Sequence, residues 1–396
     1  MDGQTSANPV TEPRPFRDPA PIELEAAGHR LTVLAAGRDR LDALLDMIAS
    51  ASRSIDMAFY IFDRDASGRK VRDALIEAVG RGVTVRLIVD GFGANDDPSF
   101  FRKLRDAGAR VWLFSPKWSR RYLIRNHQKI VIIDAARAIV GGFNVADDYF
   151  APPEENGWND LGLVIEGEAV GRLCEWYERL ESWTANPKAQ WLAIRRAVRE
   201  WTPLERPVQV LIGGPTARLS SWALAVRRDL DKARELDMVM AYFSPSNGLL
   251  RKITGVAKRG RARLVMAGKS DNGATIGATR SLYSYLLRGG VEIAEFNACK
   301  LHMKLIVIDD VTYIGSANFD MRSLYLNLEI MLRIEDKALA DKMREHVALH
   351  AASGEAITPE GHKRKAGLLN RIRWNLAWFL VAVVDYTVSR RLNLGL

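Results

Sequence analysis

Residues 127–134 read HQKIVIID and residues 302–309 read HMKLIVID, so the pattern HxKxxxxD occurs twice in this chain. Each copy is followed by a turn of small residues and an asparagine: GGFN ends at Asn144, and GSAN ends at Asn318. Histidine can act as a nucleophile or as a proton donor, while Lys and Asn can hold the oxygens of an anion. The repeated set therefore predicts one shared active site for displacement at a phosphodiester.

The candidate catalytic residues are the histidine, lysine and aspartate of each motif. Because strand side chains alternate, the histidine and lysine positions project from one face, and the aspartate falls on the opposite parity near a turn. Within the set, we therefore interpret each aspartate as a structural acceptor that holds the motif in place. The six residues are His127, Lys129 and Asp134 in the first copy, and His302, Lys304 and Asp309 in the second.

The similarity between the two halves extends beyond the motifs. SIDMAFYIF around Asp56 matches ELDMVMAYF around Asp237, an offset of 237 − 56 = 181 residues. Apolar runs with helical and strand patterns alternate in both halves. We predict an α/β fold of two duplicated lobes, each a mixed β-sheet flanked by helices. The predicted parts are a disordered tail over residues 1–30, lobe one over 31–205, lobe two over 206–352, and a C-terminal segment over 353–396.

Composition limits the class of protein. At 396 residues and 47% hydrophobic, the chain can bury a substantial core. Residues 1–30 are rich in proline and contain no apolar stretch that resembles a secretion signal or a membrane span, so we expect a cytoplasmic catalytic body. The two cysteines indicate neither a disulfide framework nor a structural zinc site. A formal net charge of +9 implies attraction to nucleic acid or to an anionic bilayer, without choosing between them.

A basic loop precedes the first motif. The interval from Phe114 to His127 is seven residues longer than that from Phe296 to His302 (13 − 6 = 7). Two interpretations stay open: the loop collects an anionic substrate, or it is an ordinary solvated loop. Its sequence, SPKWSRRYLIRN, contains Lys117, Arg120, Arg121 and Arg125 interleaved with Trp118 and Tyr122.

A carboxylate also recurs after each motif. Asp160 lies in WNDLGLVIEG and Glu329 in LNLEIMLRIED, each before an apolar run that resembles a strand. A carboxylate that accepts the N–H of one ring nitrogen fixes the tautomer of a catalytic histidine and stabilises the imidazolium. We predict that Asp160 and Glu329 orient the two histidines, and the alternative is that they are ordinary acids at a sheet edge.

These residues resemble the phospholipase D superfamily, whose signature is a duplicated HxKxxxxD followed by a glycine-rich turn and Asn. Within it, the motifs NHQKIVIID, GGFNVADDYF, HMKLIVID and GSANFDMRSLYLNLE are most similar to those of bacterial cardiolipin synthases, and the resemblance covers roughly residues 30–350. It implies that two lobes pack about a pseudo-twofold axis and share one active site. Longer members start with two transmembrane helices, and we expect this chain to be of the shorter, peripheral type.

The resemblance also implies roles for the site residues. One histidine attacks phosphorus to form a phosphohistidine, and we assign this role to His127; the other protonates the departing alkoxide and then activates the incoming alcohol. The carboxylates act across the pseudo-twofold, so that Asp160 serves His302 and Glu329 serves His127. Neither a metal nor a cofactor is implied. The groups that hold the nonbridging phosphate oxygens would be Lys129, Lys304, Asn144 and Asn318.

The C-terminal segment favours a lipid partner. Its apolar run WNLAWFLVAVV is about half the roughly 20 residues that a membrane-spanning helix needs, and cations flank it. We predict an anchor at the membrane interface, with Trp374, Trp378 and Tyr386 at the headgroup boundary. The alternative is a helix that docks on the protein's own core.

The leading hypothesis is transfer of a phosphatidyl group from one phosphatidylglycerol to another, which gives cardiolipin and glycerol. The enzyme would be peripheral on the cytoplasmic face of the bacterial cell membrane, with no obligate protein partner evident and no nucleic acid expected as partner. The alternatives are hydrolysis by a phospholipase D or by a nuclease of the same superfamily, and a membrane-binding scaffold is disfavoured because both motifs are intact. Exclusion of water from the acceptor site separates transfer from hydrolysis.

Overall fold

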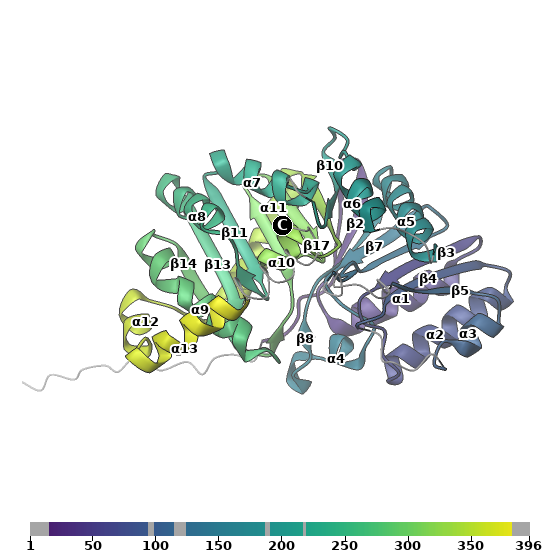
Figure 1. Cartoon of the computed structure of the whole chain (residues 1–396), viewed down its shortest axis with the longest axis horizontal. Coiled ribbons are helices and arrows are strands. Elements are labelled where there is room, and N and C mark those ends of the chain that lie inside the picture. The colour runs from purple at the N-terminus through teal and green to yellow at the C-terminus, as the bar shows by residue number, and fades with distance from the viewer. Residues whose placement is uncertain (1–15, 94–98, 115–123, 187–190, 217–218, 382–396) are drawn as a thin grey trace, which may run out of the picture.

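The computed structural model describes residues 16–93, 99–114, 124–186, 191–216 and 219–381. Two mixed sheets of eight strands form two lobes that lie side by side (Figure 1). The first sheet has the order β1 (Ile22–Ala26), β2 (His29–Leu34), β9 (Gly162–Glu166), β7 (Arg137–Gly141), β6 (Ile130–Ile133), β3 (Ser54–Phe59), β4 (Thr84–Asp90), β5 (Arg110–Phe114). The second has the order β10 (Val208–Gly213), β19 (Glu329–Glu335), β17 (Val311–Gly315), β16 (Lys304–Ile308), β11 (Glu235–Met240), β13 (Arg261–Ala267), β14 (Glu292–Phe296), β20 (Gly354–Ala356).

The two sheets repeat the same internal order, which confirms the predicted duplication. In each lobe, three parallel strands (β3, β4 and β5, or β11, β13 and β14) are followed by antiparallel strands that begin with the motif strand, β6 or β16. The central strands β3, β6, β11 and β16 are buried on both faces, as their nearly continuous apolar sequences require.

Helices cover the sheets, and the hydrophobic core has three parts. The outer core of lobe one lies under α1 and α2, and that of lobe two under α7, α8 and α9. The third part joins the inner faces of both sheets with α5 and α11, so the lobes share one hydrophobic interior. The helices are α1 (Gly37–Ser50), α2 (Ala66–Gly80), α3 (Arg102–Asp106), α4 (Asp147–Phe150), α5 (Ala169–Ala185), α6 (Trp191–Glu200), α7 (Ser221–Lys232), α8 (Asn247–Arg259), α9 (Gly273–Arg288), α10 (Met321–Tyr325), α11 (Lys337–Ala352), α12 (Pro359–Lys365) and α13 (Leu368–Trp378).

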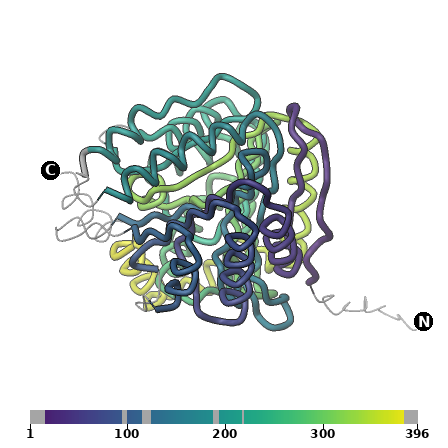
Figure 2. Tube along the Cα trace, turned by 90° about the vertical axis from the view of Figure 1, so that its right-hand side faces the viewer, coloured from purple at the N-terminus to yellow at the C-terminus, as the bar shows by residue number. Residues whose placement is uncertain are grey.

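The predicted disordered tail over residues 1–30 is wrong for residues 16–30. Alternating apolar residues in IELEA form β1, which pairs with β2 in an antiparallel hairpin. Phe16 is buried, with its ring centroid 4.8 Å from that of Phe296 in lobe two. The backbone N–H of Ala27 donates to Asp336 at 3.0 Å, just before α11. Figure 2 shows the N-terminal strands in purple beside the green helix α11. The proline content misled the prediction, because Pro19 and Pro21 directly precede a strand that pairs in the first sheet. Residues 1–15 lie outside the described residues.

The predicted end of lobe two at residue 352 also needs correction. β20 lies in the segment 353–396, yet it pairs with β14 as the edge strand of the second sheet. The chain then continues into α12 and α13. Among the helices of the described residues, none combines the length and apolar character that crossing a bilayer requires.

Candidate active site

Cross-lobe backbone pairing places each histidine. His127 lies just before β6, and its N–H donates to the carbonyl of Leu328 in lobe two at 2.9 Å. In the opposite direction, β8 (Trp158–Asn159) pairs with β15 (Lys300–Leu301), and the N–H of His302 donates to the carbonyl of Asn159 at 2.8 Å. Each motif is therefore held against the residue that precedes the other lobe's carboxylate. Because the pairing is reciprocal, the lobes are related by a pseudo-twofold.

This pairing brings each histidine against a buried carboxylate of the other lobe. His127 Nδ1 lies 3.1 Å from Glu329 Oε2, and His302 Nδ1 lies 2.6 Å from Asp160 Oδ2. Both carboxylates are fully buried. The expected crossed contacts, Asp160 with His302 and Glu329 with His127, are thus present in the structure. With Nδ1 facing the carboxylate, Nε2 is the ring nitrogen on the far side of each imidazole.

The motif lysines are buried beside their histidines. Lys129 Nζ donates to the carbonyl of His127 at 2.7 Å, while Lys304 Nζ lies 2.8 Å from His302 Nδ1. Burial lowers the pKa of Lys129 to about 7 and that of Lys304 to about 8, although the two carboxylates partly oppose this effect. Two buried ammonium groups are suited to binding an anion, because an anion would offset their charge.

The two asparagines are buried but are bonded differently. Asn144 Oδ1 accepts the N–H of Ile61 at 3.0 Å, and Asn144 also hydrogen-bonds the hydroxyl of Tyr149. Asn318 Oδ1 is buried with no hydrogen-bond partner among the residues that the structure describes. Asn144 is thus partly used to hold lobe one together, whereas the side-chain oxygen of Asn318 is an acceptor without a partner in the described residues.

Asp134 and Asp309 must be removed from the candidate catalytic set. Each follows its motif strand, seven residues after the histidine, which places it roughly 20 Å from the histidine along an extended chain. Asp134 accepts the backbone N–H groups of Ser52, Arg53 and Ser54 at 2.6–2.9 Å. The sequence spacing suggested one functional unit, but the motif strand separates its two ends.

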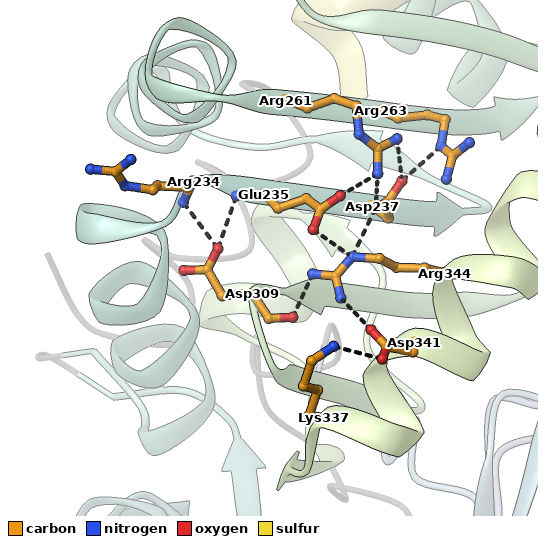
Figure 3. Close-up of polar contacts among 9 residues, drawn as sticks. All are labelled: Arg234, Glu235, Asp237, Arg261, Arg263, Asp309, Lys337, Asp341 and Arg344. Carbon is orange, nitrogen blue, oxygen red and sulfur yellow. Dashed lines mark hydrogen bonds and ion pairs between the residues drawn. The ribbon is translucent and has the colours of Figure 1, made fainter.

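Asp309 has the same structural role in lobe two. Its carboxylate accepts the N–H groups of Arg234 and Glu235 at 3.0 and 2.9 Å, at the start of β11. Figure 3 shows it beside an ion-pair network in which arginines surround the buried carboxylate of Asp237. Both motif aspartates have positive φ, 55° for Asp134 and 48° for Asp309, so they also form the turns after β6 and β16. The interpretation of the aspartates as structural acceptors is confirmed.

Aromatic side chains that the sequence analysis did not select line the site. The Tyr60 ring lies 5.2 Å from the ring of His127 and 5.4 Å from Lys129 Nζ. On the other side, Tyr149 and Trp158 lie 5.1 and 5.4 Å from His302. Tyr149 occurs in GGFNVADDYF, a motif that carried the family resemblance, but aromatic residues beside strands are usually core residues, so sequence offered little signal.

Arg40 is a second residue that the sequence analysis missed. Its guanidinium is fully buried and donates to the carbonyls of Asp160, Tyr149 and Trp158 at 2.6, 2.7 and 3.1 Å. It thereby holds the backbone that carries the carboxylate partner of His302. An arginine at the start of a helix is an ordinary surface residue in sequence, so only its burial reveals this role.

The two carboxylates are electrostatically unequal. Burial favours the neutral form of both, but Lys304 and His302 outweigh it at Asp160 and lower the pKa of that carboxyl. At Glu329 burial prevails over Lys129 and Ser316 and raises the pKa to about 8. At neutral pH the partner of His302 is therefore anionic, whereas the partner of His127 is largely protonated.

The surroundings favour the neutral form of both histidines. Burial, together with the nearby lysines, lowers the pKa of His127 well below its ordinary value and lowers that of His302 to about 3. A neutral imidazole is the nucleophilic form. An anionic substrate would shift both values upward, since a nearby negative charge favours the imidazolium.

The basic loop lies mostly outside the described residues, and with it Lys117, Trp118, Arg120, Arg121 and Tyr122. Arg125 is described: its guanidinium lies 4.2 Å from the centre of the Phe92 ring, and it donates to the hydroxyl of Tyr60 at 3.2 Å. Phe92 is 58% exposed. The part of the loop next to His127 therefore joins a cation to an exposed aromatic ring and to the wall of the site.

Comparison with known proteins agrees with this geometry. The family model described as "Cardiolipin synthase, PLD-like domain" matches residues 44–180 and 226–349. The chain is 31% identical over 322 residues to the major cardiolipin synthase ClsA of Bacillus subtilis, covering 78% of this chain and 66% of that protein. It is 30% identical over 336 residues to cardiolipin synthase A of Pseudomonas syringae, covering 80% and 67%. The chain thus spans about two thirds of the length of these relatives.

Among solved structures, the chain is similar to a phosphatidylserine synthase of Haemophilus influenzae. The TM-score is 0.73 at 13% sequence identity, and the match covers 93% of this chain and 96% of that one. At this identity the likeness concerns the fold alone. It extends over both lobes, so the paired arrangement of the sheets occurs in both proteins.

Proposed function

This chain belongs to the cardiolipin synthase family of phospholipase D-like proteins, and from this premise we propose that it is a phosphatidyltransferase. It transfers a phosphatidyl group from one phosphatidylglycerol to the glycerol hydroxyl of a second, and the products are cardiolipin and glycerol. The observation that carries the proposal is the pair of buried histidines, each held at Nδ1 by a carboxylate of the other lobe. Such a pair supplies a nucleophile and a proton carrier on opposite sides of one phosphorus.

In the first step, Nε2 of His127 attacks the phosphorus of the donor lipid. Binding of the anionic lipid raises the pKa of His302, which takes up a proton from solvent. The bond between phosphorus and the glycerol headgroup oxygen then breaks, and the imidazolium of His302 gives its proton to that oxygen. Glycerol leaves, and the phosphatidyl group stays on His127. The anionic state of Asp160 supports this assignment, because it stabilises the imidazolium that a proton donor needs, while largely neutral Glu329 leaves His127 as a free base.

In the second step, the hydroxyl of another phosphatidylglycerol enters on the side of His302. That histidine, now neutral, takes the hydroxyl proton while the oxygen attacks phosphorus, and the bond from phosphorus to His127 breaks. Cardiolipin forms, and both histidines return to their starting states. The nonbridging oxygens are held throughout by Lys129, Lys304, Asn144 and Asn318, which balance the charge that moves onto them in the transition state.

The surroundings of His302 favour transfer over hydrolysis. Tyr149, Trp158 and Tyr242 place three aromatic rings 5.1–6.4 Å from its imidazole. An acceptor that binds there displaces water from an apolar wall, and a lipid alcohol gains more from this displacement than a water molecule does. The substrates place the enzyme at a membrane surface, and we propose the cytoplasmic face.

Incubation of the purified protein with phosphatidylglycerol vesicles tests the function, with labelled single-stranded and duplex DNA in parallel and EDTA in a matched set. We expect cardiolipin and glycerol in equal amounts by mass spectrometry, with and without EDTA, and none from the His127→Ala variant. Phosphatidic acid as the main product would establish hydrolysis instead. Nicked DNA with unchanged lipid would refute a lipid function.

A further inference from the structure

The C-terminal helix α13 is docked on lobe two through one face. It packs against α9 (Figure 1), where a Cβ added at Gly277 would lie 3.0 Å from the Cβ of Ala377. Trp374 is 9% exposed and stacks on His362, with ring centroids 5.5 Å apart and an interplanar angle of 17°. Trp378 packs against the outer core of lobe two. This close fit shows that α13 has a defined orientation on the protein.

The orientation corrects the predicted anchor. Trp374 and Trp378 were expected at the lipid headgroup boundary, but both face the protein, so that prediction is wrong for them. Their indole rings fill the contact with α9 and with the core, because the small residues of α9 allow close approach. Tyr386 lies outside the described residues. For this face, the docked-helix alternative is correct.

The opposite face of α13 and its continuation carry large apolar side chains that nothing covers in the described chain. The side chains recur three or four residues apart, which is the spacing of one helix face. Twelve large hydrophobic side chains are exposed in the described residues, and half of them lie here, a concentration that marks an interaction surface. This leucine face consists of Leu368 at 76%, Leu369 at 83%, Ile372 at 57%, Leu376 at 55%, Phe379 at 49% and Leu380 at 48% exposure.

The segment that carries the leucine face contains only positive charges. From residue 361 to residue 381 the sequence contains no Asp or Glu. One of the cations pairs with Glu355, outside this stretch. A helix with an exposed apolar face and flanking cations suits an anionic bilayer surface, where acyl chains accept the leucines and headgroups attract the cations. The exposed cations are Lys363, Arg364, Lys365, Arg371 and Arg373.

The helix beneath α13 also supports the wall of the active site. Thr279, two residues after the Gly277 that touches α13, donates through Oγ1 to the carbonyl of Phe243 at 3.0 Å. Phe243 begins β12 (Phe243–Ser244), and the preceding residue, Tyr242, has its ring 6.4 Å from that of His302. The leucine face therefore belongs to the part of lobe two that forms the acceptor side of the site.

We propose that the leucine face inserts into the surface of an anionic bilayer while Trp374 and Trp378 remain docked on lobe two. The helix then acts as a rigid membrane-binding element that holds the histidine site against the membrane from which the enzyme takes its substrate. The purpose of the contact rests on the proposed function, but the contact itself does not. A second copy of this chain is the competing occupant of the same face.

Vesicle co-sedimentation tests the proposal with the triple variant Leu369→Gln/Ile372→Gln/Leu376→Gln. All three side chains are exposed, so the substitutions leave the packing of α13 on α9 intact. Removing three inserted side chains should lower the partition coefficient on phosphatidylglycerol vesicles on the order of 100-fold or more. A matched control, Leu224→Gln, changes a leucine that is 52% exposed on α7 and should bind within about twofold of the wild type.

A charge variant separates the two parts of the contact. Arg371→Gln/Arg373→Gln should weaken binding to phosphatidylglycerol vesicles on the order of 10-fold at low salt and leave binding to phosphatidylcholine vesicles unchanged. Analytical ultracentrifugation of the wild type and the triple variant shows whether the face joins two copies. Wild-type vesicle binding by the triple variant, or conversion of a dimer to a monomer with vesicle binding unchanged, would overturn the proposal.

Activity measurements keep this proposal distinct from the proposed function. The triple variant should convert short-chain, monomeric phosphatidylglycerol at the wild-type rate and lose activity only on vesicles. If the wild type binds vesicles through α13 but forms no cardiolipin from either substrate, the proposed function is refuted and the membrane contact through α13 is supported. If the triple variant keeps full activity and full binding on vesicles, the membrane contact through α13 is refuted and the proposed function is supported.

Discussion

Replacing Asp160 by Asn should damage catalysis far more than replacing Glu329 by Gln, although both changes preserve shape. Asp160 uses Oδ1 to accept the N–H of Leu161 at 2.7 Å and Oδ2 to face His302 Nδ1 at 2.6 Å. An amide has only one acceptor oxygen, and the backbone N–H can only donate. In the Asp160→Asn variant the amide oxygen therefore turns toward Leu161, and the amide NH₂ group faces His302. That arrangement forces the proton of His302 onto Nε2, the atom that has to accept a proton from the incoming alcohol.

The magnitude follows from the tautomer and from the charge. In the Ser-His-Asp triad, the same error in tautomer costs about 10⁴ in kcat. We expect a loss of about 10³–10⁴ for Asp160→Asn, equivalent to about 4–5 kcal/mol of transition-state stabilisation. Glu329 differs because burial raises its pKa to about 8, so it is largely neutral at pH 7 and Gln removes little charge. We expect about a tenfold loss in kcat for Glu329→Gln.

The assay is cardiolipin formation from phosphatidylglycerol in detergent mixed micelles, with kcat and KM measured for both variants. KM should change little in either, because each carboxylate acts through its histidine and not on the lipid. Thermal melting of each variant establishes that equal folded fractions are compared. Equal losses in the two variants, or a larger loss in Glu329→Gln, would refute the reasoning that the two carboxylates differ in charge.

Three further predictions concern the other site residues. A phosphatidyl donor with a p-nitrophenol leaving group needs no proton donor, so it should restore formation of the covalent intermediate in His302→Ala but not in His127→Ala. Mass spectrometry of the trapped protein measures this intermediate, and the reverse result would exchange the two roles. The pKa values of Lys129 and Lys304 are lowered to about 7 and 8, so these lysines lose positive charge as pH rises. KM for the lipid should therefore increase between pH 7 and 9 in a steady-state titration, and a flat profile would contradict their role. Asp134→Ala should lower the free energy of unfolding by about 1–3 kcal/mol in denaturant titration, since three backbone N–H groups lose their acceptor. The kcat of the folded enzyme should stay within about twofold, and a large loss of kcat at unchanged stability would return this residue to the catalytic set.

Much of the fold was predictable because its signals are local and repeated. Apolar runs of strand length alternate with helical patterns, and the same order occurs twice, so two similar lobes followed directly from the sequence. The two ends of the chain were predicted less well. Prolines before β1 resembled a tail, and the aromatic residues of α13 resembled a membrane anchor, because composition does not report what a segment packs against.

The sequence by itself determined the chemical groups of the site, because their types and their repetition are written in two short motifs with a following asparagine and carboxylate. Family resemblance added the crossed pairing of histidines and carboxylates. Only the tertiary structure decided how unequal the two halves are. The pKa values of Asp160 and Glu329 shift in opposite directions, and α13 turns its tryptophans inward and its leucines outward. Only the structure shows this, because pKa and exposure depend on neighbours that distant parts of the chain bring together.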